Sequence, residues 1–219
     1  MIIESKRKLG TFIFTHIQKT GGSSLKEFFE VGHHPTSHNT LEEDFNLLKQ
    51  RNSSLNLDDL FCFSILRNPW DKMVSYYFFH RQLNPNKERA IQSKLSFHDW
   101  IKFIRDRAVE KPWFAPYKKF LSYEGKFRAD YVVNFHKYQR DMDLIKFLFR
   151  KDQPLPKINV SEHDNYKKYY NDETIEIVAN IYKQDIEFFE FDFDLTAKMK
   201  KPPANKEKIL NIINKIYLN

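Results

Sequence analysis

A lysine, two glycines and several hydroxyl side chains follow the first apolar run of the chain. The run TFIFTHI covers residues 11–17 and QKTGGSS follows at 18–24, which places Lys19 just before Gly21 and Gly22. Adjacent glycines let the backbone approach a ligand closely enough for its N–H groups to contact an anion, and a lysine adds positive charge. Hydroxyl donors are supplied by Thr20, Ser23 and Ser24. This composition is typical of a phosphate-binding loop that leads into a helix.

The order of residues in this stretch argues against an ATP or GTP hydrolase. The nucleotide-binding P-loop has the pattern G-x-x-x-x-G-K-[ST], in which the lysine follows the glycines. Here Lys19 precedes them, and the first glycine of the pattern is absent. Taken alone, the stretch is also compatible with a plain turn between a strand and a helix.

A second stretch, SILRNPWDKMVSYYFFHR at 64–81, supplies an arginine and a hydroxyl group. Arg67 comes just after an apolar run, and Ser75 follows eight residues later on a predicted helix. A guanidinium fork and a nearby hydroxyl are suited to holding a phosphate. Two phosphate sites at the ends of two strands predict a nucleotide with phosphates at both ends of its ribose. The alternative for Arg67 is a surface ion pair with Asp71.

Histidines in the stretch GHHPTSHNT, at 32–40, are candidates for a general base, because imidazole titrates near neutral pH. They are His33, His34 and His38. Their irregular spacing, without a nearby cysteine, argues against a metal site. His16 lies on the first predicted strand, where we expect a core or supporting role.

Short apolar runs predict the strands of a buried parallel sheet at residues 11–17, 60–66 and 131–135. A helical pattern follows each run, and the alternation of strand and helix predicts an α/β fold. Further helices are expected at 141–150 and 173–189.

Capping residues mark the starts of several predicted helices. Ser24 and Glu27 have the spacing of a capping box, Asn68 precedes Pro69, and Ser96 opens the stretch SFHDWIKFIRDRA. Each of these residues predicts a helix that begins within one or two positions of it.

A Pro-Pro pair separates the last predicted helix, 202–217, from the rest of the chain. We therefore expect a domain over residues 1–200 and a C-terminal helix within 201–219, packed on the domain or at an oligomer contact. Its apolar stripe consists of Ile209, Ile212, Ile213 and Ile216.

Composition bounds the function classes. The 219 residues are 41% hydrophobic, enough for a core, and the net charge of +7 indicates an anionic partner or simply a soluble, lysine-rich surface. Cys62, the single cysteine, excludes an internal disulfide. No apolar run reaches the length of a membrane span, and the first residues lack the order of a signal peptide.

Two motifs resemble those of a known family. HIQKTGGSSL, at 16–25, is similar to the HIPKTGGTSL element of carbohydrate sulfotransferases of the sulfotransferase family 2 type, and LRNPWDKMVSYYFF, at 66–79, resembles their VRNPYDRLVSAYYF element. Weaker similarity extends the match over roughly 11–195. Three departures stand out: Gln18 replaces a proline, Gln139 replaces the acid of the YE-x-L segment, and the glycine of FGYxF is missing at Glu190-Phe191.

The resemblance implies a P-loop-like three-layer α/β fold, with a central parallel sheet flanked by helices. It also implies PAPS (3′-phosphoadenosine 5′-phosphosulfate) as co-substrate, PAP as product, and no required metal. The 5′-phosphosulfate would bind to the loop residues Lys19, Thr20, Gly21, Gly22, Ser23 and Ser24. Arg67 and Ser75 would hold the 3′-phosphate. Lys19 would stabilise the leaving group, and His38, or alternatively His34, would act as the base.

We therefore predict an O-sulfotransferase that acts on a carbohydrate or glycan. Alternatives are a protein tyrosine or small alcohol as acceptor, a small-molecule kinase of related fold, or a nucleic-acid-binding protein. The kinase would need an acidic metal ligand where Arg67 stands, and no nucleic-acid-binding motif is present. Trp113, Phe114 and Tyr117 are aromatic residues that would either stack on a sugar or pack in the core. We expect a cytoplasmic enzyme of bacterial type, or a Golgi-lumen enzyme if an anchor precedes this sequence.

Overall fold

The computed structural model describes residues 1–4, 11–30, 38–82, 94–107, 114–156 and 163–217. The chain divides into two compact units. We call them the sheet unit (Met1–Leu66, Tyr117–Ile158 and Lys201–Asn219) and the helical unit (Arg67–Pro116 and Asn159–Lys200). The predicted assignment of 1–200 as one domain stays a prediction.

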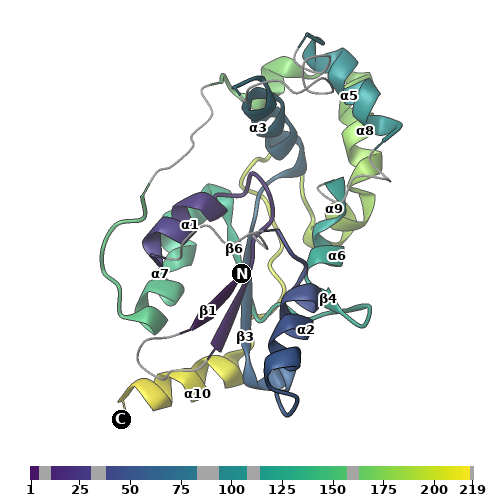
Figure 1. The fold of residues 1–219 in the computed structure, drawn as a ribbon. Helices are drawn as coiled ribbons and strands as arrows, with labels where there is room; N and C mark the ends of the chain where they lie inside the picture. The colour runs from purple at the N-terminus through teal and green to yellow at the C-terminus, as the bar shows by residue number, and fades with distance from the viewer. Residues whose placement is uncertain (5–10, 31–37, 83–93, 108–113, 157–162, 218–219) are drawn as a thin grey trace. The chain divides into compact units, whose positions relative to one another are not determined.

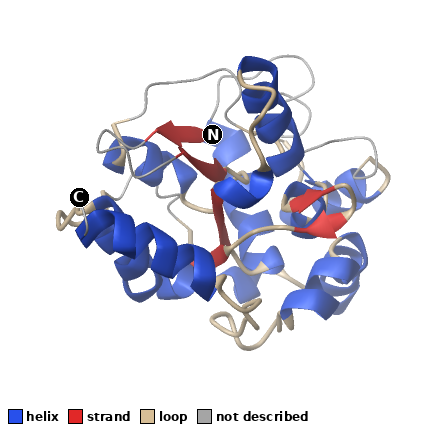
Figure 2. Cartoon of the chain, turned by 90° about the horizontal axis from the view of Figure 1, so that it is seen from below, coloured by secondary structure: helices blue, strands red, loops and turns tan. Residues whose placement is uncertain are grey.

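The sheet unit is built on a four-stranded sheet of mostly parallel strands, drawn in red in Figure 2. In spatial order the strands are β1 (Ile2–Glu4), β2 (Thr11–Thr15), β3 (Phe61–Leu66) and β6 (Tyr131–Asn134). The strands β2, β3 and β6 pair in parallel, and β1 pairs antiparallel with β2 at the edge. The three predicted strands are confirmed, although two end earlier than expected. Sequence analysis missed β1, because three residues are too short a run to show a period.

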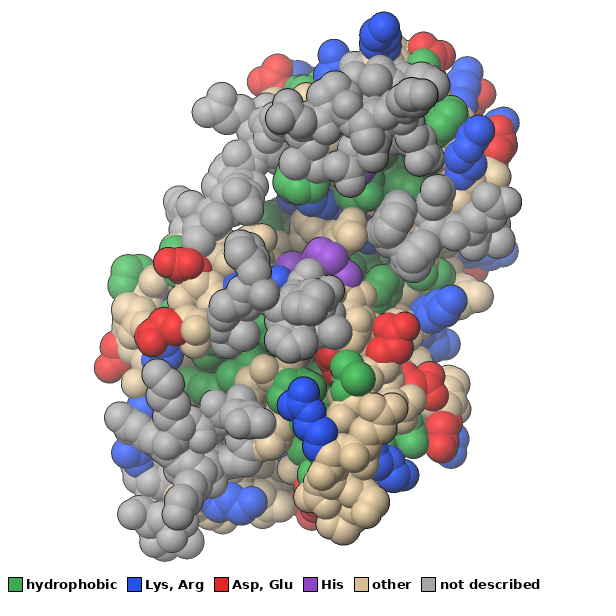
Figure 3. Space-filling view, in the orientation of Figure 1, with side chains coloured by type: hydrophobic (Ala, Val, Ile, Leu, Met, Phe, Trp, Pro, Cys, Tyr) green, Lys and Arg blue, Asp and Glu red, His purple; other side chains and the backbone are tan. Residues whose placement is uncertain are grey.

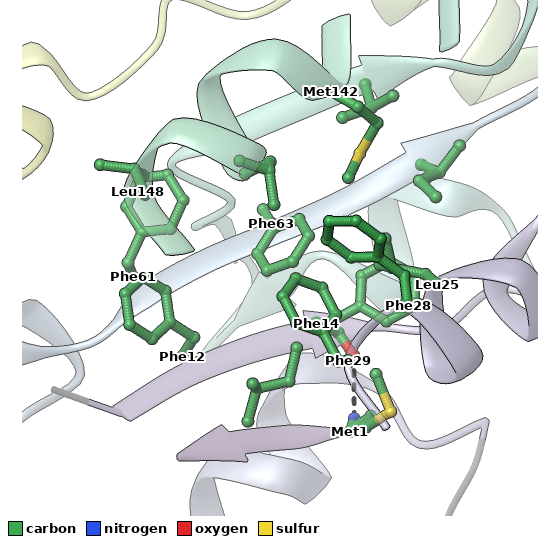
Figure 4. Close-up of a cluster of buried hydrophobic side chains, with 14 of the residues drawn as sticks. Met1, Phe12, Phe14, Leu25, Phe28, Phe29, Phe61, Phe63, Met142 and Leu148 are labelled. Carbon is green, nitrogen blue, oxygen red and sulfur yellow. Dashed lines mark hydrogen bonds between the residues drawn. The ribbon is translucent and has the colours of Figure 1, made fainter. Parts of the chain in front are cut away.

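Helices cover both faces of this sheet, as Figure 1 shows. On one face, α1 (Gly22–Phe28), α7 (Tyr138–Phe149) and α10 (Lys206–Tyr217) contribute to a core with Phe14 and Phe63 of the strands (Figure 4). On the other face, α2 (Leu41–Arg51) packs against Ile13 and Cys62. The alternation of side chains along each strand therefore feeds two cores. The predicted three-layer α/β fold with a largely parallel sheet is confirmed.

Smaller elements complete the sheet unit. They are the 3-10 helices η1 (Leu57–Asp59) and η3 (Phe135–Lys137), the short helix α6 (Tyr117–Phe120), and a hairpin of β4 (Ser122–Tyr123) and β5 (Lys126–Phe127). The helix α10 is tied to the sheet at its first turn. Asn205 donates to Asp130 at 2.9 Å, and Lys208 donates to the same carboxylate at 3.1 Å. Ile212 of the predicted stripe is buried in the core, and the side chain of Ile216 lies outside the described part.

The helical unit contains α3 (Pro69–Gln82), α5 (Phe97–Arg105), η4 (Tyr166–Tyr169), α8 (Asp172–Ile181) and α9 (Lys183–Phe189). As predicted, the hydroxyl of Ser96 caps α5, accepting from the Asp99 N–H at 3.1 Å. The predicted single helix at 173–189 is wrong. The chain leaves helical geometry at Tyr182 (φ −106°, ψ 22°), because this buried ring packs beside α3, so α8 and α9 are separate.

The described surface carries charges of both signs. On the face drawn in Figure 3, Lys and Arg side chains are interspersed with Asp and Glu. Among the described residues, no helix is both long and apolar enough to cross a bilayer.

Candidate active site

The predicted phosphate loop connects β2 to α1 through a tight, partly left-handed backbone. Gly21 has φ 91° and Lys19 has φ 60°, a conformation that non-glycine residues adopt only at a cost. The helix α1 begins at Gly22, two residues before the predicted start, and no side chain caps it. The predicted Ser24–Glu27 capping box is therefore wrong, because Ser24 already lies within the first turn.

Hydroxyl groups of the loop have different roles. Thr20 is fully buried and donates its hydroxyl proton to the Ile17 carbonyl oxygen at 2.8 Å. Its side chain thus closes the loop on itself. Ser23 is partly exposed and Ser24 is buried. The structure therefore assigns Thr20 a structural hydrogen bond, in addition to any contact with a ligand through its N–H.

The missing side chains of both glycines leave room for rings of the sheet unit. A Cβ on Gly21 would lie 3.3 Å from the Phe135 ring, and a Cβ on Gly22 would lie 1.8 Å from Cδ2 of His16. Gly22 has no left-handed φ, so its requirement is one of space rather than of conformation. The sequence suggested that the glycines admit a ligand; the structure adds that they admit packing beneath the loop.

His38 lies next to His16, at the end of β2. The two imidazole centroids are 4.5 Å apart, and Nδ1 of His38 is 3.1 Å from the carbonyl oxygen of His16. Because a carbonyl only accepts, this bond places the proton of neutral His38 on Nδ1 and leaves the lone pair on Nε2. Partial burial lowers the pKa of His38; the His16 hydrogen bond opposes this, and the positive charge of Lys26 adds to it.

A hydrogen-bonded carboxylate holds the segment around His38. Asn39 donates from Nδ2 to Oδ1 of Asp44 at 3.0 Å, and the α-ammonium of Met1 donates to Oδ2 of the same buried carboxylate. Burial lowers the pKa of the Met1 ammonium, although Asp44 raises it. Thr40, the next residue, caps α2 in a capping box with Glu43. Sequence analysis did not single out Asp44. His33 and His34 lie outside the described residues.

Arg67, which directly follows β3, belongs to the helical unit and pairs with Asp71. Its Nε donates to Oδ2 at 2.7 Å and its Nη2 donates to Oδ1 at 2.9 Å, and both side chains are buried. The ion pair considered as an alternative thus exists, but as a buried bidentate contact. Two of the five N–H donors of a guanidinium suffice for it, so it also orients the group. Ser75, two turns along α3, is buried in the same unit.

The helix α3 carries further buried polar groups. As predicted, Asn68 caps the helix, accepting from the Trp70 N–H at 3.1 Å, and it also donates to the Asp192 carbonyl at 2.8 Å. Lys72 is fully buried with Nζ 3.3 Å from the Tyr182 hydroxyl. Burial lowers the pKa of Lys72 to about 7, and nearby Asp185 opposes the shift. Sequence analysis passed over Lys72, because nothing local distinguishes a buried lysine from an exposed one.

Two of the three departures from the family pattern lie at or near ion-paired residues. Two residues beyond Gln139, the buried carboxylate of Asp141 accepts from the Asn134 N–H at 2.9 Å and pairs with Lys201 at 2.6 Å. Burial raises the pKa of Asp141, but these bonds outweigh it and lower the pKa overall. Where the glycine is missing, Glu190 itself adopts the left-handed conformation, with φ 51°. Its carboxylate pairs with Lys200 at 2.8 Å.

Two residues of the aromatic stretch are packed inside the protein. Phe114 and Tyr117 are buried in the helical unit and the sheet unit, respectively, and Trp113 lies outside the described residues. The packing alternative therefore holds for these two. Within the described ranges, no three His, Cys, Asp or Glu side chains are grouped as a metal site would require.

Comparison with known proteins identifies the family. Residues 5–192 match the family described as the sulfotransferase family, and this range contains the loop, the two histidines and the Arg67 segment. No curated protein and no solved structure gave a significant match. Because the match spans most of the 219 residues, it settles the class of enzyme. The chain belongs to the sulfotransferase family, whose members are PAPS-dependent sulfotransferases.

Proposed function

We propose that the enzyme transfers the sulfuryl group of PAPS to a hydroxyl of a carbohydrate, with His38 as the base. The observation that carries this proposal is the hydrogen bond of His38 Nδ1 to the His16 carbonyl, three residues before Lys19. It leaves Nε2 of His38 as the basic nitrogen beside a loop rich in donors. Carbohydrate as the acceptor rests on the similarity of the two sequence motifs to carbohydrate sulfotransferases.

The donor set of the loop fits the 5′-phosphosulfate. Between Ile17 and Ser24 there is no carboxylate, and the side chains of Lys19 and Ser23 are partly exposed. The N–H groups of Gly22 and Ser23 stand in the first turn of α1, where no carbonyl of that helix can accept them. Positive charge and N–H donors are what a phosphosulfate requires.

Lys19 and His38 have different roles in the proposed transfer reaction. When bound, PAPS supplies a sulfuryl group attached to a phosphate that departs as PAP. The ammonium of Lys19 stabilises negative charge on the departing oxygen. Nε2 of His38 accepts the proton of the acceptor hydroxyl as that oxygen bonds to sulfur. The lowered pKa of His38 keeps its imidazole neutral, and thus basic, at pH 7. The proposed steps use no metal ion.

Arg67 and Ser75 are proposed to bind the 3′-phosphate. Asp71 holds the guanidinium plane of Arg67 through two hydrogen bonds, which reduces the rotamer entropy lost on binding. A guanidinium and a hydroxyl at this position would bind the 3′-phosphate of PAP. ATP has no 3′-phosphate, so the site should bind PAP more tightly than ATP.

A thermal-shift experiment with PAP and ATP tests the nucleotide site. A ligand at a hundredfold excess over its Kd stabilises the native state by about 2.7 kcal/mol. We expect a clear rise in melting temperature with PAP and little with ATP. Arg67→Ala should lose the PAP effect, and Arg67→Lys, which keeps a charge opposite Asp71, should lose most of it. Equal stabilisation by ATP and PAP in the wild type would argue for the kinase alternative.

The histidine assignment is tested by His38→Ala and His34→Ala, with radiolabelled PAPS and a panel of glycans, tyrosine peptides and small alcohols. We expect His38→Ala to lower the transfer rate by ~10²–10⁴-fold, the usual contribution of a general base. The His34→Ala variant serves as the matched control. The reverse ranking would assign the base to His34, and labelling of a peptide or alcohol alone would replace the carbohydrate acceptor.

A further inference from the structure

The imidazole of His16 fills the space that a side chain at position 22 would occupy. A Cβ built on Gly22 would lie 1.8 Å from Cδ2 and 2.1 Å from Nε2 of this ring, far inside the 3.5–4.0 Å of a favourable carbon contact. His16 is 5% exposed, and the Phe14 ring stacks beside the His16 ring with centroids 5.8 Å apart. His16 therefore has little room to move away from the loop.

The same residue contacts the proposed base in two ways. Its ring lies 4.5 Å from the His38 ring, with 41° between the planes, and its carbonyl oxygen receives the His38 Nδ1 bond. One residue thus contacts the phosphate loop with its ring, and His38 with both its ring and its backbone. All of these contacts lie within the sheet unit.

We propose that His16 is a positioning residue that couples the phosphate loop to His38. The His16 ring is confined by Phe14, Gly22 and His38. It fixes the orientation of the His38 imidazole, and it also sets how closely the loop backbone at Gly22 approaches the sheet. The inference rests on the proposed function, in which this loop binds the 5′ end of PAPS and His38 is the base. It explains why position 22 carries glycine although its backbone conformation does not demand one.

The inference predicts a specific rescue. Gly22→Ala should force the His16 ring against His38 and raise the Kd for PAP at least tenfold, a change of about 1.4 kcal/mol. In His16→Ala/Gly22→Ala the ring is gone and the new methyl group has room, so PAP binding should return to within about threefold of His16→Ala. A double variant that binds PAP as poorly as Gly22→Ala would overturn the proposal.

The NMR signal of the His38 ring can distinguish coupling through His16 from a purely structural role of His16. A purely structural role would not change how this signal responds to PAP. In proteins labelled with ¹³C-histidine, the His38 ring signal, assigned with His38→Ala, is followed through a pH titration with and without PAP. We expect PAP to shift this signal in both proteins through its charge, and to shift it markedly less in His16→Ala, where the contact between the loop and His38 through the His16 ring is lost. The charged groups around His38 are Lys26, the Met1 ammonium and Asp44, which is hydrogen-bonded to Asn39. These groups are the same in the wild type and in His16→Ala. An equal PAP-induced shift in His16→Ala would refute the coupling.

The variant His16→Phe provides a second test in case His16→Ala does not fold. It keeps a ring between Phe14 and His38, so it should retain PAP binding and the PAP-induced shift of His38. If His16→Phe folds but loses PAP binding or the PAP-induced shift of His38, the coupling depends on the imidazole nitrogens and not on ring packing. That result would overturn the proposal. If the wild type itself does not bind PAP, the proposed function fails instead, so the two failures are distinguishable.

Discussion

The phosphate loop and the segment from Arg67 to Ser75 are ordered by different forces. The loop depends on backbone geometry: left-handed φ at Lys19 and Gly21, and a missing side chain at Gly22. The Arg67–Ser75 segment depends on buried polar side chains, namely Arg67, Asn68, Asp71, Lys72 and Ser75. Both elements are proposed to bind phosphate, yet one is shaped by sterics and the other by charge.

This difference predicts different sensitivities. In the loop, adding a methyl group should do more harm to the structure than removing a charge. In the Arg67 segment, removing one charge takes the opposite charge away from a buried partner, which is costly in a low-dielectric environment. Variants that remove a charge from either element, or that add a methyl group to the loop, test this difference.

The largest effect on stability is expected for Asp71→Ala. It removes both hydrogen bonds from Arg67 and leaves a buried guanidinium without its carboxylate, a loss of about 3–5 kcal/mol. Urea unfolding measures the change. The control is Glu173→Ala in the same unit, whose ion pair with Lys102 is exposed and should contribute less than about 1 kcal/mol. Equal losses in the two variants would mean that burial of the Arg67 pair has no special weight.

A contrasting outcome is expected for Lys19→Ala in the loop. The left-handed backbone remains as it was, so the free energy of unfolding should change by only about 0.5 kcal/mol. The rate of sulfuryl transfer should nevertheless fall by ~10²–10³-fold, because charge stabilisation at the departing oxygen is lost. The matched control is Lys126→Ala, an exposed lysine of β5 in the same unit. A fall of the same size in both variants would point to net charge instead of a specific role for Lys19.

The buried Lys72 predicts a pH effect on the Arg67 segment. Its pKa is about 7 in the folded protein, against an ordinary value of 10.5. Between these values the unfolded chain binds the extra proton, so stability rises with pH, by at most about 1.4 kcal/mol per pH unit. Urea unfolding from pH 7.5 to 9.5 should therefore show the wild type gaining stability relative to Lys72→Met. Parallel curves would mean that the folded protein keeps this lysine charged.

Much of the architecture follows from the sequence, because strand periodicity and helix caps are local signals. The runs at 11–17 and 60–66, Ser96 and Asn68 all predicted elements within two residues of the observed ones. Errors arose where tertiary packing decides. Burial of Tyr182 divides the predicted helix at 173–189, and the start of α1 at Gly22 displaces the predicted cap.

The same limit applies to the candidate site. Residue types singled out the loop and Arg67 as candidates for phosphate binding and the histidine segment as a candidate for the base, and these assignments stay predictions. The contacts of His16 with Gly22 and of Asn39 with Asp44 join residues six and five positions apart across turns. No pattern of residue types encodes them, because they depend on how the backbone turns after β2 and at the start of α2.

A comparison of two glycines separates backbone strain from crowding in the loop. Gly21 and Gly125 both have left-handed φ, 91° and 73°, but a Cβ on Gly125 would meet nothing within 4 Å, whereas one on Gly21 would lie 3.3 Å from Phe135. Gly125→Ala in the β4–β5 hairpin should cost about 1–2 kcal/mol from strain alone. Gly21→Ala should cost more in urea unfolding, and only this variant should weaken PAP binding. If the two losses are equal, Phe135 yields to the methyl group and strain alone shapes this part of the loop.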